Sequence, residues 1–142
     1  PYPEHLSRYT LADLFLDTFP YNAHTTASDA LWAGLPVVTR AGRSFASRVG
    51  ASLLTTLGMP ELIVGDEAAY QSLAIELAQD PARRQGLRDK LAALRDGSPL
   101  FSGSALARPV ETAFRAIAGR YAAGKPAAAL TIAADGSASF ED

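Results

Sequence analysis

The pattern that most constrains the fold is a series of short apolar runs separated by helical segments. The runs at 14–18 and 36–39 have the length and branching of buried strands, and a weaker third run covers 62–64. Segment 24–34 starts with residues that cap helices and ends at a glycine, and segment 47–57 carries apolar residues on one face. The order strand, helix, strand, helix, strand predicts an α/β fold with a parallel sheet and right-handed crossovers.

Helical patterns continue after the third run. An amphipathic stripe over 67–79 predicts a helix that packs on the sheet, and Asp80-Pro81 caps and opens the next helix. The basic residues of this next helix are interpreted as a solvated face rather than a phosphate site, because acidic residues are interleaved with them. They are Arg83, Arg84, Arg88 and Lys90.

A last helix is expected over 105–121, and its predicted buried side consists of Val110, Ala113, Phe114 and Ile117. After it the sequence is dominated by alanine, glycine and small polar residues. We therefore expect one ordered lobe over 1–121 and a flexible tail over 122–142.

Charge and composition exclude several classes of function. The 142 residues contain 13 Lys+Arg and 15 Asp+Glu, a net charge of −2, and no cysteine. This balance argues against nucleic-acid or anionic-membrane binding, and no apolar run approaches the roughly 20 residues of a membrane span. The absence of cysteine fits a cytoplasmic protein. The start Pro1-Tyr2-Pro3, with neither an initiator Met nor a signal peptide, predicts a segment of a longer protein.

Segment 17–39 carries the candidate chemistry. A strand ends near Thr18, and the next helix begins at His24-Thr25-Thr26. Free N–H groups and the positive end of that helix point to the crevice where α/β sheets bind ligands, so a phosphate or diphosphate is the expected guest. Asp29 follows one turn later and could accept hydrogen bonds from ribose hydroxyls. Together these groups indicate a nucleotide.

Each residue of this group also has a purely structural interpretation. Thr25 and Thr26 could simply cap the helix, His24 could be a surface residue, and Asp29 could be a favourable charge near a helix N-terminus. The nucleotide hypothesis depends on their conjunction at one strand-to-helix turn.

Five strings, of which two lie in this segment and a third overlaps it, resemble the catalytic region of the O-GlcNAc transferase and SPINDLY family, glycosyltransferase family 41, in its bacterial form. The resemblance covers about 3–121 and consists of several dense strings in the family's order. The strings are ADLFLDT at 12–18, NAHTT at 22–26, SDALWAGLPVVT at 28–39, FASRVGASLL at 45–54 and SPLF at 98–101.

This resemblance implies the C-terminal, nucleotide-binding lobe of a GT-B enzyme, with a Rossmann-like parallel sheet. It implies that Thr25 and Thr26 contact the diphosphate beside His24, and that Asp29 binds the ribose. His5 and Arg8 match positions that contact the uracil base, although a polar helix turn explains them equally well. They complete the list of expected nucleotide-sugar contacts. No residue of this segment is assigned as catalytic.

The resemblance also implies a reaction and its partners. The expected reaction is metal-independent, inverting transfer of GlcNAc from UDP-GlcNAc to Ser or Thr hydroxyls of a protein or peptide acceptor, without a cofactor. An upstream lobe and TPR repeats would belong to the same protein, and this segment alone would be inactive. Two alternatives stay open: a relative that uses UDP-glucose with an Asn acceptor or GDP-fucose, and a non-catalytic nucleotide-binding module. This chain departs from the family at one place. The family carries a lysine a few residues before the position of His5, whereas this chain has Tyr2 and no lysine there.

Overall fold

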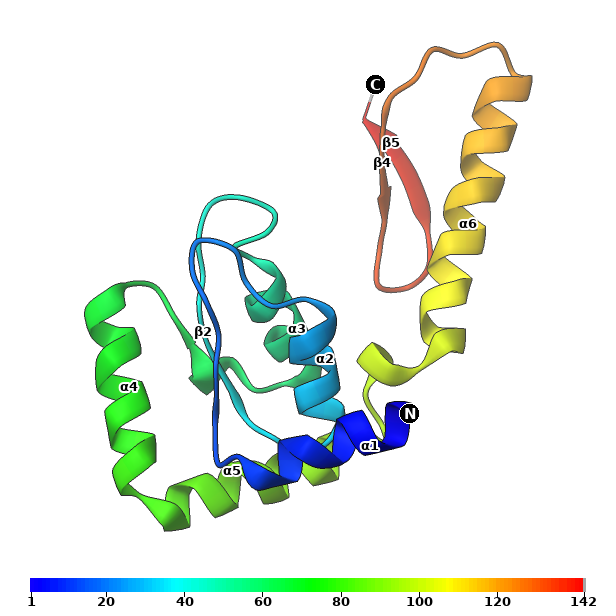
Figure 1. The fold of residues 1–142 in the computed structure, drawn as a ribbon. Coiled ribbons are helices and arrows are strands. Elements are labelled where there is room, and N and C mark those ends of the chain that lie inside the picture. The colour runs from blue at the N-terminus through cyan, green and yellow to red at the C-terminus, as the bar shows by residue number, and fades with distance from the viewer. Residues whose placement is uncertain (142) are drawn as a thin grey trace. The chain divides into compact units, whose positions relative to one another are not determined.

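A computed structural model describes residues 1–141, which divide into two compact units. The first unit is Pro1–Ser98, and the second begins at Pro99. We describe each unit by itself (Figure 1).

The first unit is built on a three-stranded parallel sheet in the order β1-β2-β3. The strands are β1 (Phe15–Leu16), β2 (Val37–Arg40) and β3 (Ile63–Val64). Phe15 pairs with Val37, and Thr39 pairs with Ile63. The predicted order of strands and helices is confirmed, although β1 is shorter than its apolar run. Strand β2 lies in the middle, which explains why its first three residues are buried.

Helices connect and cover these strands (Figure 1). They are α1 (Tyr2–Ser7), α2 (Thr25–Trp32), α3 (Val49–Leu57), α4 (Glu67–Gln79) and α5 (Pro81–Arg95), with short 3-10 turns η1 (Arg8–Leu11) and η2 (Pro60–Leu62). Their ends follow local chemistry. The Asp66 carboxylate caps α4, the Asp80 carboxylate caps α5, and α3 ends at Gly58, whose φ of 78° is the left-handed conformation that glycine adopts without strain.

The core of the first unit is aliphatic. Side chains from the middle strand and from four helices are removed from solvent, as the amphipathic patterns predict. The completely buried members include Ala30, Leu31, Val37, Val38, Leu54, Leu77 and Leu91.

The basic face of α5 differs in part from its prediction. Arg83 pairs with Glu76, and Lys90 pairs with Glu61, both near the surface. Two other arginines turn inward and bond to backbone carbonyls: Arg84 donates to Leu77 and Ala78, and Arg88 donates to Ala12 and Gly34. The expectation that Arg84 and Arg88 face solvent is therefore wrong, because their guanidinium groups satisfy carbonyls of neighbouring segments.

The second unit is a long helix with a strand pair beside it. It contains η3 (Pro99–Phe101), α6 (Gly103–Ala122), β4 (Ala129–Ile132) and β5 (Ala138–Glu141). Strands β4 and β5 are antiparallel and lie along α6 (Figure 1). The Arg120 guanidinium lies over the Phe140 ring of β5, 4.5 Å from its centroid.

Helix α6 includes the predicted 105–121 and extends beyond it at both ends, but its apolar stripe is not buried. Val110 is 40% exposed, Phe114 68% and Ile117 50%. The expected buried side is therefore wrong for these three residues. The hairpin covers a neighbouring face of the helix that includes Arg120, so the amphipathic pattern correctly identified a helix and misidentified its covered face.

The expected division into a lobe over 1–121 and a flexible tail over 122–142 stays a prediction. The structure adds that residues 129–132 and 138–141 of this tail form an antiparallel pair. Within residues 1–141, no helix combines the length and the apolar character that crossing a lipid bilayer requires.

Candidate nucleotide-binding site

A short, well-bonded loop leads from β1 into α2. The Thr18 hydroxyl donates to the carbonyl of Tyr21 at 2.8 Å, and the Asn22 side-chain amide donates to the carbonyl of Thr18 at 2.8 Å. Asn22 is 1% exposed, and its backbone N–H donates to the carbonyl of Ala46 at 3.0 Å. These bonds fix the path of the chain, so that α2 begins beyond the carboxyl end of β1, where α/β sheets bind ligands.

The start of α2 has no side-chain cap. The N-cap residue His24 makes no capping bond, and within residues 1–141 no hydrogen bond involves the hydroxyl of Thr25 or Thr26, both of which are exposed. By contrast, α4, α5 and α6 begin at capping residues, which are Asp66, Asp80 and Ser102. The first amides of α2 and two adjacent hydroxyls are therefore available to an anion.

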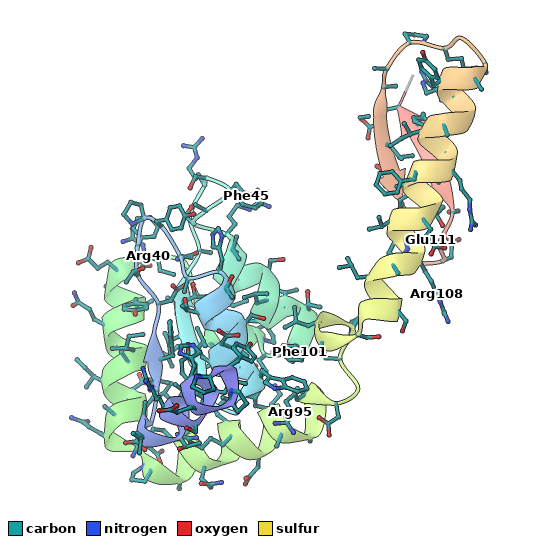
Figure 2. All side chains as sticks on the ribbon, turned by 45° about the vertical axis from the view of Figure 1, so that its right-hand side comes forward. Arg40, Phe45, Arg95, Phe101, Arg108 and Glu111 are labelled. Carbon is teal, nitrogen blue, oxygen red and sulfur yellow. The ribbon has the colours of Figure 1, made fainter. Side chains whose placement is uncertain are left out.

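Aromatic rings enclose the imidazole of His24. The Tyr21 ring stacks on it with centroids 5.1 Å apart, and the Phe45 ring meets it edge-on at 5.9 Å. Its Nε2 is buried and has no hydrogen-bond partner in the described part of the chain. Phe45 belongs to the loop after β2, and Arg40 stands at the end of that strand (Figure 2). The imidazole nitrogen is thus a buried polar group beside an uncapped helix start.

The loop and the helix start line an open hollow of about 400 Å³. Thr18, Asn22, His24 and Thr26 contribute to its wall. A larger hollow of about 820 Å³ runs along α3 and shares Phe45 as a wall. The smaller hollow adjoins the first amides of α2 and the Thr26 hydroxyl, so its chemistry fits an anion. The larger one is lined by Arg48 and by apolar and hydroxyl side chains of α3.

Asp29 lies one turn into α2 and is 8% exposed. The Tyr2 hydroxyl donates to its Oδ1 at 2.7 Å, and the Nε2 of His5 lies 3.5 Å from its Oδ2. The hydrogen bond to Asp29 raises the pKa of the Tyr2 phenol, since the carboxylate favours the protonated hydroxyl. The structure therefore brings His5 and Asp29 together.

Helix α1 and the turn η1 supply three rings that contact one another near this carboxylate. The rings of Tyr2 and His5 stack at 6.2 Å, and those of His5 and Tyr9 meet edge-on at 5.5 Å. Burial raises the pKa of the Tyr9 phenol, and the charge of Asp29 raises it further. Arg8 is exposed in η1. The roles of all six predicted residues toward a ligand stay predictions.

Sequence reasoning gave Tyr2 no role. Tyr2 is 27 positions from Asp29 in the chain, and only the placement of α1 beside α2 brings the phenol to the carboxylate. The available signal was the departure from the family pattern, because Tyr2 stands in the region before His5 where the family carries a lysine.

Comparison with known proteins decides the family. Residues 1–109 match the profile described as Glycosyl transferase family 41. The chain belongs to glycosyltransferase family 41. The predicted family is thereby confirmed.

The relatives of this family 41 chain are much longer proteins. It is 41% identical over 121 residues to a protein of Hordeum vulgare named probable UDP-N-acetylglucosamine–peptide N-acetylglucosaminyltransferase SPINDLY. The aligned residues are 85% of this chain and 13% of that protein. It is 39% identical over 123 residues to the UDP-N-acetylglucosamine–peptide N-acetylglucosaminyltransferase of Caenorhabditis elegans. This alignment covers 87% of this chain and 11% of that protein. The chain thus spans about an eighth of the first of these relatives.

A solved structure shows the same fold. A mutant O-GlcNAc transferase of Thermobaculum terrenum matches with a TM-score of 0.73 and 36% identity, over 81% of this chain and 22% of that one. This match confirms the expected α/β fold class.

Proposed function

We propose that this chain is the nucleotide-binding lobe of an inverting protein glycosyltransferase of the GT-B type. The proposed reaction transfers GlcNAc from UDP-GlcNAc to Ser or Thr hydroxyls of a protein or peptide. Support comes from family 41 membership and from the names of the relatives, which are peptide N-acetylglucosaminyltransferases. An acceptor-binding lobe and TPR repeats elsewhere in the protein belong to the same proposal.

The observation that carries the proposal is the uncapped start of α2. The hydroxyls of Thr25 and Thr26 and the first amides of α2 have no partners among the described residues, and Thr26 lines the hollow beside His24, whose buried Nε2 also lacks one. A diphosphate supplies oxygens for all of these groups. Asp29, one turn away, would accept hydrogen bonds from the ribose, and His5 and Arg8 would contact the uracil.

These donors also explain how the lobe would help the reaction. Negative charge grows on the diphosphate as the bond between the sugar carbon and the phosphate oxygen breaks. Fixed amides at a helix N-terminus stabilise that charge without reorganisation, so they lower the barrier more than they strengthen ground-state binding. The proposed chemistry therefore assigns leaving-group stabilisation to the start of α2, and it requires no metal ion or cofactor.

The acceptor must be held beside the donor for transfer to occur, and this chain supplies only donor-binding groups in the proposal. We expect the 142-residue chain to bind UDP and to be inactive alone. A donor panel of UDP-GlcNAc, UDP-glucose and GDP-fucose with the whole protein would identify the sugar. Nucleotide binding without any transfer would favour the non-catalytic module.

The direct test is calorimetry with UDP and uridine. The double variant Thr25→Ala/Thr26→Ala should weaken UDP binding by at least about tenfold, which corresponds to about 1.4 kcal/mol, and should leave uridine binding unchanged. The matched control is Thr55→Ala/Thr56→Ala, an exposed threonine pair on α3. Unchanged UDP affinity in the first variant would refute the proposal.

A further inference from the structure

We propose that Asp17 is a positioning residue, whose buried carboxylate holds the start of α2 in the place where it meets the diphosphate. This inference rests on the proposed nucleotide function. Asp17 follows β1 directly and is 5% exposed. It is not among the groups expected to touch the ligand, so its effect would be exerted through the main chain of the loop that it grips.

Both carboxylate oxygens of Asp17 are engaged. Oδ1 accepts the backbone N–H of Ala23 at 2.7 Å, and Oδ2 accepts the Thr39 hydroxyl at 2.6 Å. Ala23 immediately precedes His24, the N-cap residue of α2. The carboxylate therefore ties the residue before the helix to β2, the middle strand of the sheet.

Asp17 is itself firmly held by its backbone. Its N–H donates to the carbonyl of Val38 at 3.0 Å, and its carbonyl accepts the Tyr70 hydroxyl at 2.8 Å. The Tyr70 phenol is protonated at neutral pH and can donate, and burial together with the nearby Asp17 charge raises its pKa further. Because the backbone of Asp17 is fixed, its carboxylate can hold the amide of Ala23 in a defined place, which a mobile side chain could not do.

A glycine makes room for this arrangement. A Cβ atom placed on Gly50, in the first turn of α3, would lie 2.6 Å from Asp17 Oδ2 and 2.6 Å from Thr39 Oγ1. Since carbon and oxygen atoms do not approach so closely without bonding, any larger residue at 50 must displace the carboxylate or the hydroxyl. Three segments therefore converge on one hydrogen-bonded carboxylate.

Stability alone does not account for a carboxylate here. Removing a charge from water is costly, and a well-packed apolar side chain often stabilises a buried position as well or better. A carboxylate differs from an apolar side chain because its oxygens accept directional hydrogen bonds, which orient the donor groups. Here one of those donors is the amide of Ala23, next to the proposed phosphate site.

The test compares Asp17→Ala with Asp17→Asn in the 142-residue chain. The Asn carbonyl can still accept from Ala23, so UDP affinity should stay within about threefold of the wild type, whereas Asp17→Ala should lose at least about tenfold. Uridine affinity should change by less than about twofold in both, because the nucleoside is bound further along α2. A merely structural role would weaken UDP and uridine equally, and that result would overturn the proposal.

Gly50→Ala provides a second variant that leaves Asp17 in place, with Gly86→Ala as its matched control. Both glycines lie in helices, but a Cβ on Gly86 meets nothing within 4 Å. We expect Gly50→Ala to weaken UDP by at least about tenfold and Gly86→Ala to leave the affinity unchanged. Unaltered UDP binding by folded Gly50→Ala would contradict the proposal.

Amide hydrogen exchange gives a readout that needs no ligand. The N–H of Ala23 should exchange faster in Asp17→Ala and in Gly50→Ala than in the wild type, and at an unchanged rate in Gly86→Ala. If the wild-type chain does not bind UDP, the proposed function fails, and exchange at Ala23 still decides whether Asp17 positions the helix start. An unchanged exchange rate in Asp17→Ala would refute the positioning role.

Discussion

The two units of this chain use amphipathic helices in different ways. In the first unit, Leu31 of α2, Leu54 of α3 and Leu91 of α5 are all completely buried. In the second unit, α6 is longer than any of these helices at 20 residues, and no residue of it, all of which the structure describes, is buried. Periodicity therefore determines where a helix forms, and tertiary partners determine whether its apolar face is covered.

The contrast extends to the polar groups. In the first unit, the buried Asp17 carboxylate accepts two hydrogen bonds. Arg88 of α5 donates to the carbonyl of Gly34, which is 54 positions away in the chain. In the second unit, the Asp135 carboxylate makes a local contact of the opposite kind, because it accepts from the hydroxyl and the amide of Ser137 within one turn. These bonds hold the pKa of Asp135 below its usual value. Long-range hydrogen bonds of buried polar groups are thus a feature of the unit that carries the candidate site.

The largest expected effect is the loss of stability caused by a cavity in the core of the first unit. Leu54→Ala should lower its free energy of unfolding by about 2–5 kcal/mol, because Leu54 is completely buried. Urea denaturation followed by the fluorescence of Trp32, the single tryptophan, reports on this unit. The matched control is Leu106→Ala on α6, followed by far-ultraviolet circular dichroism, where the leucine is 66% exposed and the change should stay within about 0.5 kcal/mol. Equal losses in the two variants would remove the contrast between the units.

Helix caps should behave alike in both units, because a cap acts locally. Asp66 caps α4 and Ser102 caps α6, each by accepting the N–H three residues on. Each substitution by Ala should cost about 0.5–2 kcal/mol in its own helix. Trp32 fluorescence would measure the first and far-ultraviolet circular dichroism the second. If Ser102→Ala leaves the helix signal unchanged, the capping bond of α6 contributes nothing.

The smallest expected effect is a gain in helix stability when a helical glycine is replaced by alanine. Gly86 in α5 and Gly119 in α6 both have open space where a Cβ would stand, so alanine should fit in each. Each substitution should stabilise its helix by about 0.5–1 kcal/mol, since alanine loses less backbone entropy than glycine. Thermal unfolding monitored by circular dichroism would measure both. Destabilisation by Gly119→Ala would show that this part of α6 is more crowded than the structure indicates.

The sequence predicted those features that depend on neighbours along the chain. The strand runs, the start of α2 and the position of Thr25 and Thr26 at a strand-to-helix turn all follow from local patterns. The family resemblance added Asp29 and His5, which the structure places 3.5 Å apart. These predictions required only periodicity, capping residues and recognisable strings.

The remaining features depend on how distant segments pack. The bond from Tyr2 to Asp29, the bond from Thr39 to Asp17 and the inward turn of Arg88 join residues 27, 22 and 54 or more positions apart. No local pattern encodes such pairs. The exposed stripe of α6 was mispredicted for the same reason, because an apolar face in the sequence does not say which element covers it.

The central claim is that the start of α2 binds the diphosphate of a nucleotide. The most direct measurement is an NMR titration of the isotopically labelled 142-residue chain with UDP, with uridine as the reference ligand. We expect UDP to shift the amide resonances of Ala23 to Ala27 strongly, uridine to leave them nearly unchanged, and both ligands to perturb the surroundings of Asp29 and His5. UDP shifts confined to α3 or to the second unit, or none at all, would contradict it.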